Sequence, residues 1–298
     1  MQLGTCLMRL KELGFDKSLE MAAKAGFKFL DVDLTNANVP VDDKDEKNFF
    51  GAFKAKMDAL GVKASQAHAP YVRGIKTDFE FFESEEYFKS VLSSIRRAEI
   101  IGAPYLVMHT FAPYPADYEN IQFDREPIKE ELFERNLAVL KRFEPYAERA
   151  GIKLAVENLN MHGFLSRSAV PTTGSDSADL NRYIDALGDK NYCVCYDVGH
   201  LNLLTSDTES NFINSLGKRI QVIHAHDNFG MLNDWFGELD RHLPPFVGCV
   251  NWELVIKELK KVGFDKTFSL ELGNFYPTEF TEEFYDYAFK AGNKIINF

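Results

Sequence analysis

Histidine, aspartate and glutamate recur at the downstream ends of short apolar segments in this chain. Six successive segments each end near one such residue: His68, His109, Glu157, Asp197, His226 and Glu271. Imidazole and carboxylate groups bind zinc or manganese, and also magnesium, cobalt or iron. A single histidine in such a place usually only forms a hydrogen bond. The repetition over six segments predicts a site for one to three divalent metal ions, with zinc or manganese as the first choices.

Two short motifs enlarge this set of candidate ligands. Asp197-Val-Gly-His200 adds a histidine one turn beyond Asp197, and Asp240-Arg-His242 offers two ligands. Alternate residues of an extended chain point to the same side, so Asp240 and His242 can face one ion. Arg241 between them is a candidate for contacting an anionic substrate.

The segments that must position these residues are of two alternating kinds. Eight short runs rich in Val, Ile and Phe are predicted strands: Leu3–Cys6, Phe27–Leu34, Lys63–Ala69, Tyr105–Thr110, Ile152–Asn158, Asn191–Asp197, Ile220–Asp227 and Phe268–Leu272. Longer amphipathic runs are predicted helices: Lys17–Ala25, Lys44–Leu60, Ser84–Ile101, Lys129–Ala150, Asp176–Leu187, Thr208–Leu216, Trp252–Val262 and Thr281–Ile296. We expect Phe79, Phe81 and Phe82 in a loop at the mouth of the fold.

The repeated strand–helix order predicts an α/β fold, a (β/α)8 TIM barrel that forms one domain over residues 1–298. Five predicted helices end in glycine just before a strand, namely Gly26, Gly61, Gly102, Gly151 and Gly263, as is typical of βα repeats. A doubly wound open sheet is the rival fold. Its dinucleotide-binding version has no support, because no Gly-x-Gly-x-x-Gly follows the first strand.

Barrel enzymes keep their catalytic residues at the carboxyl ends of the strands. Strand side chains alternate between faces, so Cys193, Cys195 and Asp197 share the inner face of the sixth strand. By the same rule His224 points inward one step below His226. We expect His224 to orient a neighbouring ligand rather than bind an ion itself, and the two cysteines to fill the barrel core.

The composition is that of an ordinary globular protein, with 298 residues, 45% hydrophobic residues and a formal net charge of −11. The acidic balance argues against nucleic acid as a partner, because phosphate backbones are bound mainly by Lys and Arg. The segment Met1–Leu10 lacks the long apolar run that a signal peptide would have, so we expect none. The sequence has no apolar run that would span a membrane and no Cys-x-x-Cys pair. We expect a cytoplasmic protein with reduced thiols, and a homo-oligomer remains an open option.

Several motifs together resemble the xylose isomerase-like barrel superfamily. They are Gln66-Ala-His68-Ala-Pro-Tyr71, Val156-Glu157-Asn158, Tyr196-Asp197-Val-Gly-His200, His224-Ala-His226-Asp-Asn228, Asp240-Arg-His242-Leu-Pro and Leu270-Glu271-Leu272. That group contains sugar and sugar-phosphate isomerases and epimerases, inosose dehydratases and type IV apurinic endonucleases. The resemblance covers most of the chain, from about Gly4 to Glu271, and it implies the barrel fold and a metal-dependent activity.

The epimerase branch of the superfamily implies one metal ion held by Glu157, Asp197, His226 and Glu271. The two glutamates would also be the catalytic acid/base pair that moves a proton next to a carbonyl. His200, Arg241, Asn158 and Trp235 are the candidate substrate-binding residues, and the substrate would be a sugar or a sugar phosphate.

The endonuclease branch implies three zinc ions that share nine ligands. All nine positions are filled here: His68, His109, Glu157, Asp197, His200, His226, Asp240, His242 and Glu271. A multinuclear phosphoesterase is therefore the alternative function. The acidic character of the predicted loops Asn36–Lys47 and Phe229–Val250 favours small-molecule chemistry over DNA. A barrel that binds a sugar or a metal without turnover is a third hypothesis.

Overall fold

Eight parallel strands close into a barrel in the computed structural model of the chain, which describes residues 1–35, 43–72, 76–111, 126–162, 169–204, 207–230 and 240–298. The barrel strands are β1 Gln2–Cys6, β2 Phe29–Asp33, β3 Lys63–His68, β4 Tyr105–Met108, β5 Lys153–Glu157, β8 Tyr192–Asp197, β9 Ile220–Ala225 and β10 Thr267–Leu270. Each strand pairs with its neighbour in chain order, and β10 closes the ring on β1. The predicted (β/α)8 barrel is confirmed.

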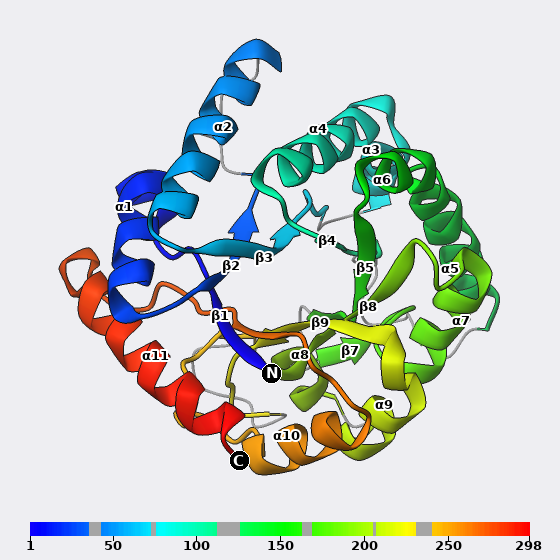
Figure 1. Ribbon diagram of the computed structural model, residues 1–298. Helices are drawn as coiled ribbons and strands as arrows, with labels where there is room; N and C mark the ends of the chain where they lie inside the picture. The colour runs from blue at the N-terminus through cyan, green and yellow to red at the C-terminus, as the bar shows by residue number, and fades with distance from the viewer. Residues whose placement is uncertain (36–42, 73–75, 112–125, 163–168, 205–206, 231–239) are drawn as a thin grey trace.

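Helices surround the barrel on the outside, as Figure 1 shows in a view along its axis. They are α1 Leu10–Ala25, α2 Asp43–Ala59, α4 Glu85–Ile101, α5 Glu126–Lys141, α6 Glu144–Ala150, α7 Ser177–Leu187, α9 Glu209–Leu216, α10 Trp252–Lys261 and α11 Thr281–Ile296. All five glycines predicted to end helices have a positive φ. Among the described helices, none is long and apolar enough to cross a membrane.

The predicted helix Lys129–Ala150 is wrong in one respect, because the structure divides it into α5 and α6. Pro145 lies in the first turn of α6. A proline inside a continuous helix would remove one backbone hydrogen bond and clash with the carbonyl four residues earlier. At the start of a new helix its missing N–H costs nothing, so the helix breaks just before it.

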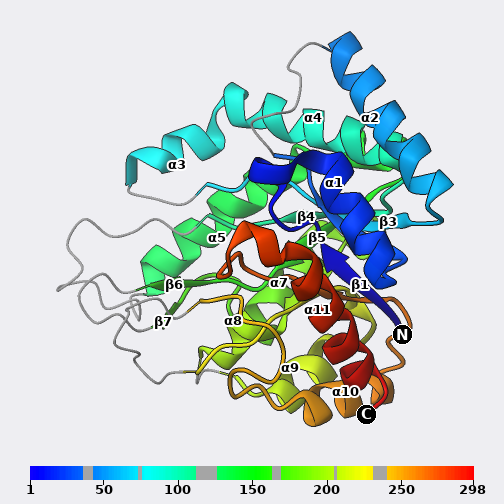
Figure 2. The same ribbon diagram turned by 90° about the vertical axis from the view of Figure 1, so that its left-hand side faces the viewer.

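Four further elements lie outside the predicted pattern. The expected loop around Phe79–Phe82 is instead helix α3 Lys76–Glu83, and Phe82 is buried against Tyr87 and Phe111. A short helix α8 Val198–Asn202 follows β8 directly, and an antiparallel hairpin joins β6 Asn160–His162 to β7 Ala169–Pro171. In Figure 2 this hairpin and the two chain termini lie at opposite ends of the molecule.

The barrel interior holds small and medium-sized side chains below the carboxyl ends of the strands. Val107, Ala155, Cys193, Cys195 and Val222 form one buried cluster there. The expectation that Cys193 and Cys195 fill the core is confirmed. A second and larger core packs between the strands and the surrounding helices. The rigid interior positions the polar residues one layer above it.

Candidate metal centre

The carboxyl ends of the strands bring all nine predicted ligands, together with His224, into three adjacent groups, in each of which the ligand atoms lie within 4.8 Å of one another. The first group contains His68, His109 and Glu157. The second contains Glu157, Asp197, His224 and Glu271. The third contains His200, His226, Asp240 and His242.

Glu157, the last residue of β5, joins the first two groups. Its side chain is 1% exposed. Its Oε2 lies 2.8 Å from His109 Nε2 and 3.6 Å from His68 Nε2. Its Oε1 lies 3.3 Å from the Nδ1 atoms of both His200 and His224. Because histidine nitrogens lie near both of its oxygens, Glu157 could help to hold an ion in either group.

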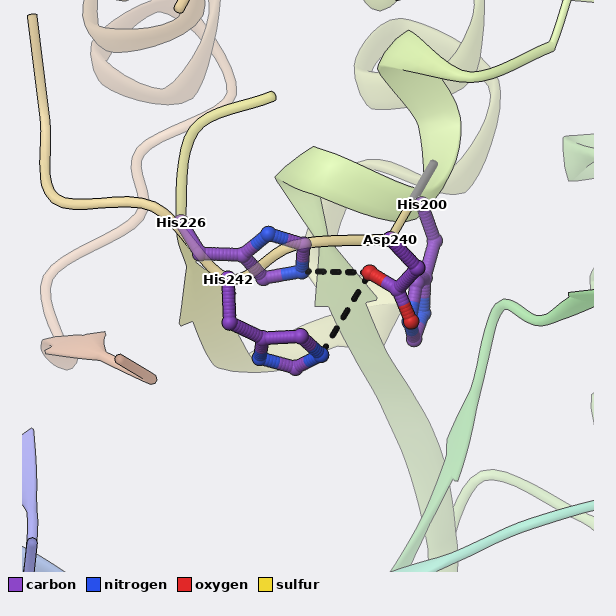
Figure 3. Close-up of side chains that lie close together, drawn as sticks. All are labelled: His200, His226, Asp240 and His242. Atoms are coloured by element: carbon purple, nitrogen blue, oxygen red, sulfur yellow. Dashed lines mark hydrogen bonds and ion pairs between the residues drawn. The ribbon is translucent and has the colours of Figure 1, made fainter. Parts of the chain in front are cut away.

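The third group centres on Asp240, as Figure 3 shows. Asp240 Oδ1 lies 3.6 Å from His226 Nε2 and 3.4 Å from His242 Nε2, and Oδ2 lies 3.2 Å from His200 Nε2. The rings of His226 and His242 stack with centroids 3.9 Å apart. His226 Nε2 is also 3.1 Å from Asp197 Oδ1, so the third group adjoins the second.

The short helix α8 positions His200 above the carboxyl ends of the barrel strands. The Asp197 carboxylate caps this helix by accepting the backbone N–H of His200 at 2.7 Å. The Asn158 amide joins β5 to β8, since it donates to the Asp197 carbonyl at 2.9 Å and accepts the Asp197 N–H at 2.6 Å. Asn158 is fully buried. These bonds give Asn158 a structural role, and its contact with substrate stays a prediction.

The groups of opposite charge shift one another's pKa values. Burial alone would raise the pKa of Glu157, but His224 and His109 outweigh it and hold that pKa well below its usual value. Burial disfavours the charged form of His68 and His242, yet Glu157 beside His68 and Asp240 beside His242 raise each pKa to about 9. In the metal-free protein the positive charge of the imidazolium ions therefore compensates the negative charge of the carboxylates. A bound divalent cation would supply this positive charge instead.

Several buried ligand atoms have no hydrogen-bond partner within the described part of the chain. They include Asp197 Oδ2, Asp240 Oδ1 and both ring nitrogens of His226. Buried polar atoms in native proteins are almost always satisfied by a hydrogen bond, a water or an ion. The unsatisfied atoms, the donor types and their convergence all fit a metal centre.

The structure places His224, which the sequence predicts to orient a neighbouring ligand, beside two carboxylates of the second group. Its Nδ1 lies 3.3 Å from Glu157 Oε1 and 3.4 Å from Glu271 Oε2, so it takes a place in the second group. The resemblance assigns that place to His226, whose ring instead joins the third group. Strand alternation predicts that both histidine side chains point into the barrel. It does not predict how their rings are oriented.

A pocket of about 120 Å³ opens beside Glu271 and His68. It is also lined by Asp31 and Asp33 from β2 and by Tyr71. The sequence reasoning missed both aspartates, although the alternation Phe29, Asp31, Asp33 on the second strand is the signal that identified the other ligands. Arg241 is partly exposed, and Trp235 lies outside the described residues. A larger cavity of about 570 Å³ lies around Lys63, Tyr105 and Lys266 at the opposite end of the barrel, away from these ligands.

Related proteins match this chain over part of their length. An uncharacterized protein of Methanocaldococcus jannaschii is 30% identical over 148 residues, which are 48% of this chain and 45% of that protein. A probable endonuclease 4 of Methanoculleus marisnigri is 26% identical over 206 residues, 64% of each chain. An inosose isomerase of Bacillus velezensis is 25% identical over 185 residues, 62% of this chain and 58% of that one.

Solved structures share the fold over the whole chain. A D-tagatose 3-epimerase-like protein superposes with a TM-score of 0.72 at 21% identity, covering 100% of this chain and 98% of that one. The IOLI protein with a bound zinc atom superposes with a TM-score of 0.68 at 19% identity, covering 99% and 96%. At these identities the likeness shows the fold. The family profile described as Xylose isomerase-like TIM barrel matches residues 19–284, so the chain belongs to that family.

Proposed function

We propose that this protein is a divalent-metal-dependent isomerase or epimerase of a sugar or sugar phosphate, which moves a proton at the carbon next to a carbonyl. The observation that carries the proposal is the placement of two glutamates, Glu157 and Glu271, in one group of ligands with Asp197 and His224. A proton transfer at carbon needs a base and an acid near the same substrate atom.

The two glutamates differ in their surroundings. The Glu157 side chain is 1% exposed and the Glu271 side chain 22% exposed, and each has an oxygen within 3.4 Å of His224 Nδ1. When bound, a divalent ion would polarise the carbonyl and the adjacent hydroxyl and so acidify the C–H between them. In this proposal Glu271, which borders the pocket, would take the proton. Glu157, which contacts His109, would return a proton.

The related proteins support sugar chemistry in general terms. The solved structures with the same fold include a D-psicose 3-epimerase and an L-ribulose 3-epimerase, and the sequence relatives include an inosose isomerase. These activities are properties of those proteins. For this chain they favour a small polyhydroxylated substrate, with zinc or manganese as the first ions to test.

The direct test is solvent exchange. The metal-reconstituted protein would be incubated in D2O with a panel of ketoses, aldoses and their phosphates, and each sugar analysed by mass spectrometry. We expect one deuterium in the converted sugar, and none in Glu271→Gln or Glu157→Gln. Glu99→Gln, an exposed glutamate on α4, is the matched control and should convert as the wild type does. Conversion without deuterium would favour a hydride shift, and full exchange in Glu271→Gln would refute the assigned role.

A second candidate function is phosphoester hydrolysis on two or three ions. The third group of ligands favours it, because a one-metal epimerase does not require His200, Asp240 and His242 together. The match to probable endonuclease 4 proteins points the same way. Incubation of the zinc-loaded protein with a duplex that contains one abasic site tests this candidate. If the protein cleaves the DNA strand and this cleavage requires Asp240, phosphoester hydrolysis becomes the proposed function in place of sugar isomerisation or epimerisation.

A further inference from the structure

The cavity of about 570 Å³ lies at the amino-terminal ends of the barrel strands, opposite the metal ligands. Six strands begin at this cavity, and their first or second residues form part of its wall: Gln2, Phe29, Lys63, Tyr105, Gln221 and Thr267. A neighbouring cavity of about 400 Å³ shares Tyr105, Gln221 and Lys266 with it. Pockets that bind small molecules commonly measure about 300–1,000 Å³, so the space is large enough for such a ligand.

Four polar groups of this wall have unused hydrogen-bonding capacity. Within the described part of the chain, no hydrogen bond or ion pair engages the Lys63 ammonium, the Tyr105 hydroxyl, the Gln221 side-chain amide or the Thr267 hydroxyl. Thr267 is 8% exposed, and Tyr105 and Gln221 are partly buried. Small-molecule sites typically combine a concave wall with a few convergent polar groups of this kind.

The charge on the wall favours an anion, although the whole chain carries a net charge of −11. Three lysines line the cavity, Lys54, Lys63 and Lys266, against two aspartates. Lys54 pairs with Asp58 at 2.6 Å, and Lys266 pairs with Asp265 at 3.1 Å. Lys63 has no such partner among the described residues, so its ammonium is available to bind the negative group of a ligand.

Gln66 separates this cavity from the metal centre. It is 1% exposed, and its side-chain N–H donates to Asp31 Oδ2 at 3.0 Å. We propose that the cavity is a second binding site, for a small hydroxylated anion of the sugar acid or sugar phosphate type, whose negative group pairs with Lys63. Its hydroxyl groups would bond to Tyr105, Gln221 and Thr267. Barrel enzymes carry out their reactions at the carboxyl ends of the strands, so this site binds without chemistry of its own and is independent of the proposed function.

The first experiment measures binding to the metal-reconstituted protein by isothermal titration calorimetry. The probes are D-gluconate, D-glucose 6-phosphate and uncharged D-glucose. Lys28→Gln is the matched control for Lys63→Gln, because Lys28 is exposed directly before β2 but does not line the cavity. We expect at least one anion to bind and glucose not to bind. The affinity for the anion should fall about tenfold in Lys63→Gln, the usual effect of losing a charged hydrogen-bond partner, and stay unchanged in Lys28→Gln.

Which anion binds identifies the negative group as carboxylate or phosphate. Equal affinities in the two lysine variants would overturn the proposal, as would glucose binding as tightly as the anions or no binding of either anion.

A second experiment locates the anion in the wild-type protein. Lysines would be labelled with a trace of acetic anhydride, with and without the anion that binds, and acetylation at each lysine measured by mass spectrometry. Acetylation of Lys63 should fall in proportion to the occupied fraction, while that of Lys28 should not change. Unchanged acetylation of Lys63 at saturation would place the anion elsewhere and refute the assignment.

Discussion

Gly199 is the position where the structure predicts the largest effect from the smallest change. It lies in α8, next to the ring of His226. A methyl group at Gly199 would lie 2.0 Å from His226 Cε1 and 2.2 Å from Nδ1. Carbon atoms in contact stand about 3.5 Å or more apart, so Gly199→Ala must move the ring or the helix by roughly 1.5 Å.

Neither partner is free to make that movement. The Gly199 carbonyl accepts the side-chain N–H of Asn228 at 2.8 Å, and the Asp197 carboxylate caps the start of α8. The His226 ring is stacked on the ring of His242. Metal–ligand distances tolerate only about 0.2 Å, so a shift of about 1.5 Å would prevent His226 from acting as the predicted ligand and would disturb His242. We expect zinc affinity at the third group to fall at least 100-fold, since even the loss of a ligand's supporting partner costs about 10–100-fold.

The assay is zinc titration with a chelator competitor, together with urea unfolding of the metal-free protein. Gly199→Ala should unfold about 1–3 kcal/mol more easily, the usual cost of overpacking a core. Gly51→Ala in α2 is the control, because no atom lies within 4 Å of the added methyl group. It should leave zinc binding unchanged and stabilise the helix by up to about 1 kcal/mol. If Gly199→Ala bound zinc as tightly and in the same number as Gly51→Ala, the reasoning about this site would be refuted.

Three further predictions follow from contacts around the site. In the metal-free protein, melting temperature should fall as pH rises from 6.5 toward 9, because the pKa values of His68 and His242 are raised from 6.5 to about 9. The stability from their imidazolium forms is complete below pH 6.5 and is lost through pH 9, so a flat profile by differential scanning fluorimetry would contradict the charge balance. Asp227→Ala should destabilise the protein by about 2–4 kcal/mol in urea, since this buried carboxylate accepts N–H groups from Phe246, Val250 and Trp252; a loss below 0.5 kcal/mol would contradict it. Removing the metal with a chelator should lower the melting temperature, and zinc should restore it in proportion to the logarithm of its free concentration; no shift would argue against a folded-state site.

The sequence was sufficient for the parts of the structure that follow from periodicity. Strand alternation correctly placed Cys193 and Cys195 in the core and directed Asp197, His224 and His226 inward. The same alternation on the second strand puts Asp31 and Asp33 on one face, and both residues line the pocket beside Glu271. The helix break before Pro145 could also be predicted from the sequence, because proline is tolerated only in the first turn of a helix.

Other features depend on three-dimensional packing and have no local signal. Which of His224 and His226 faces Glu157 and Glu271 is decided by ring orientations, and these depend on Asp31, Gly199 and His242 from distant parts of the chain. The structural role of Asn158 arises in the same way, from its pairing with the backbone of Asp197. Sequence spacing predicts that such residues meet, but not which atoms of one face which atoms of another.

The central claim is that the strand ends form a metal centre, and the number of bound ions tests it most directly. The purified protein would be stripped with a chelator, reconstituted separately with zinc and with manganese, and measured by native mass spectrometry and elemental analysis. We predict one to three ions per chain, with at least one lost in Glu157→Gln, because Glu157 contributes to two of the three groups. A wild-type chain that carries no ion after reconstitution would contradict the account.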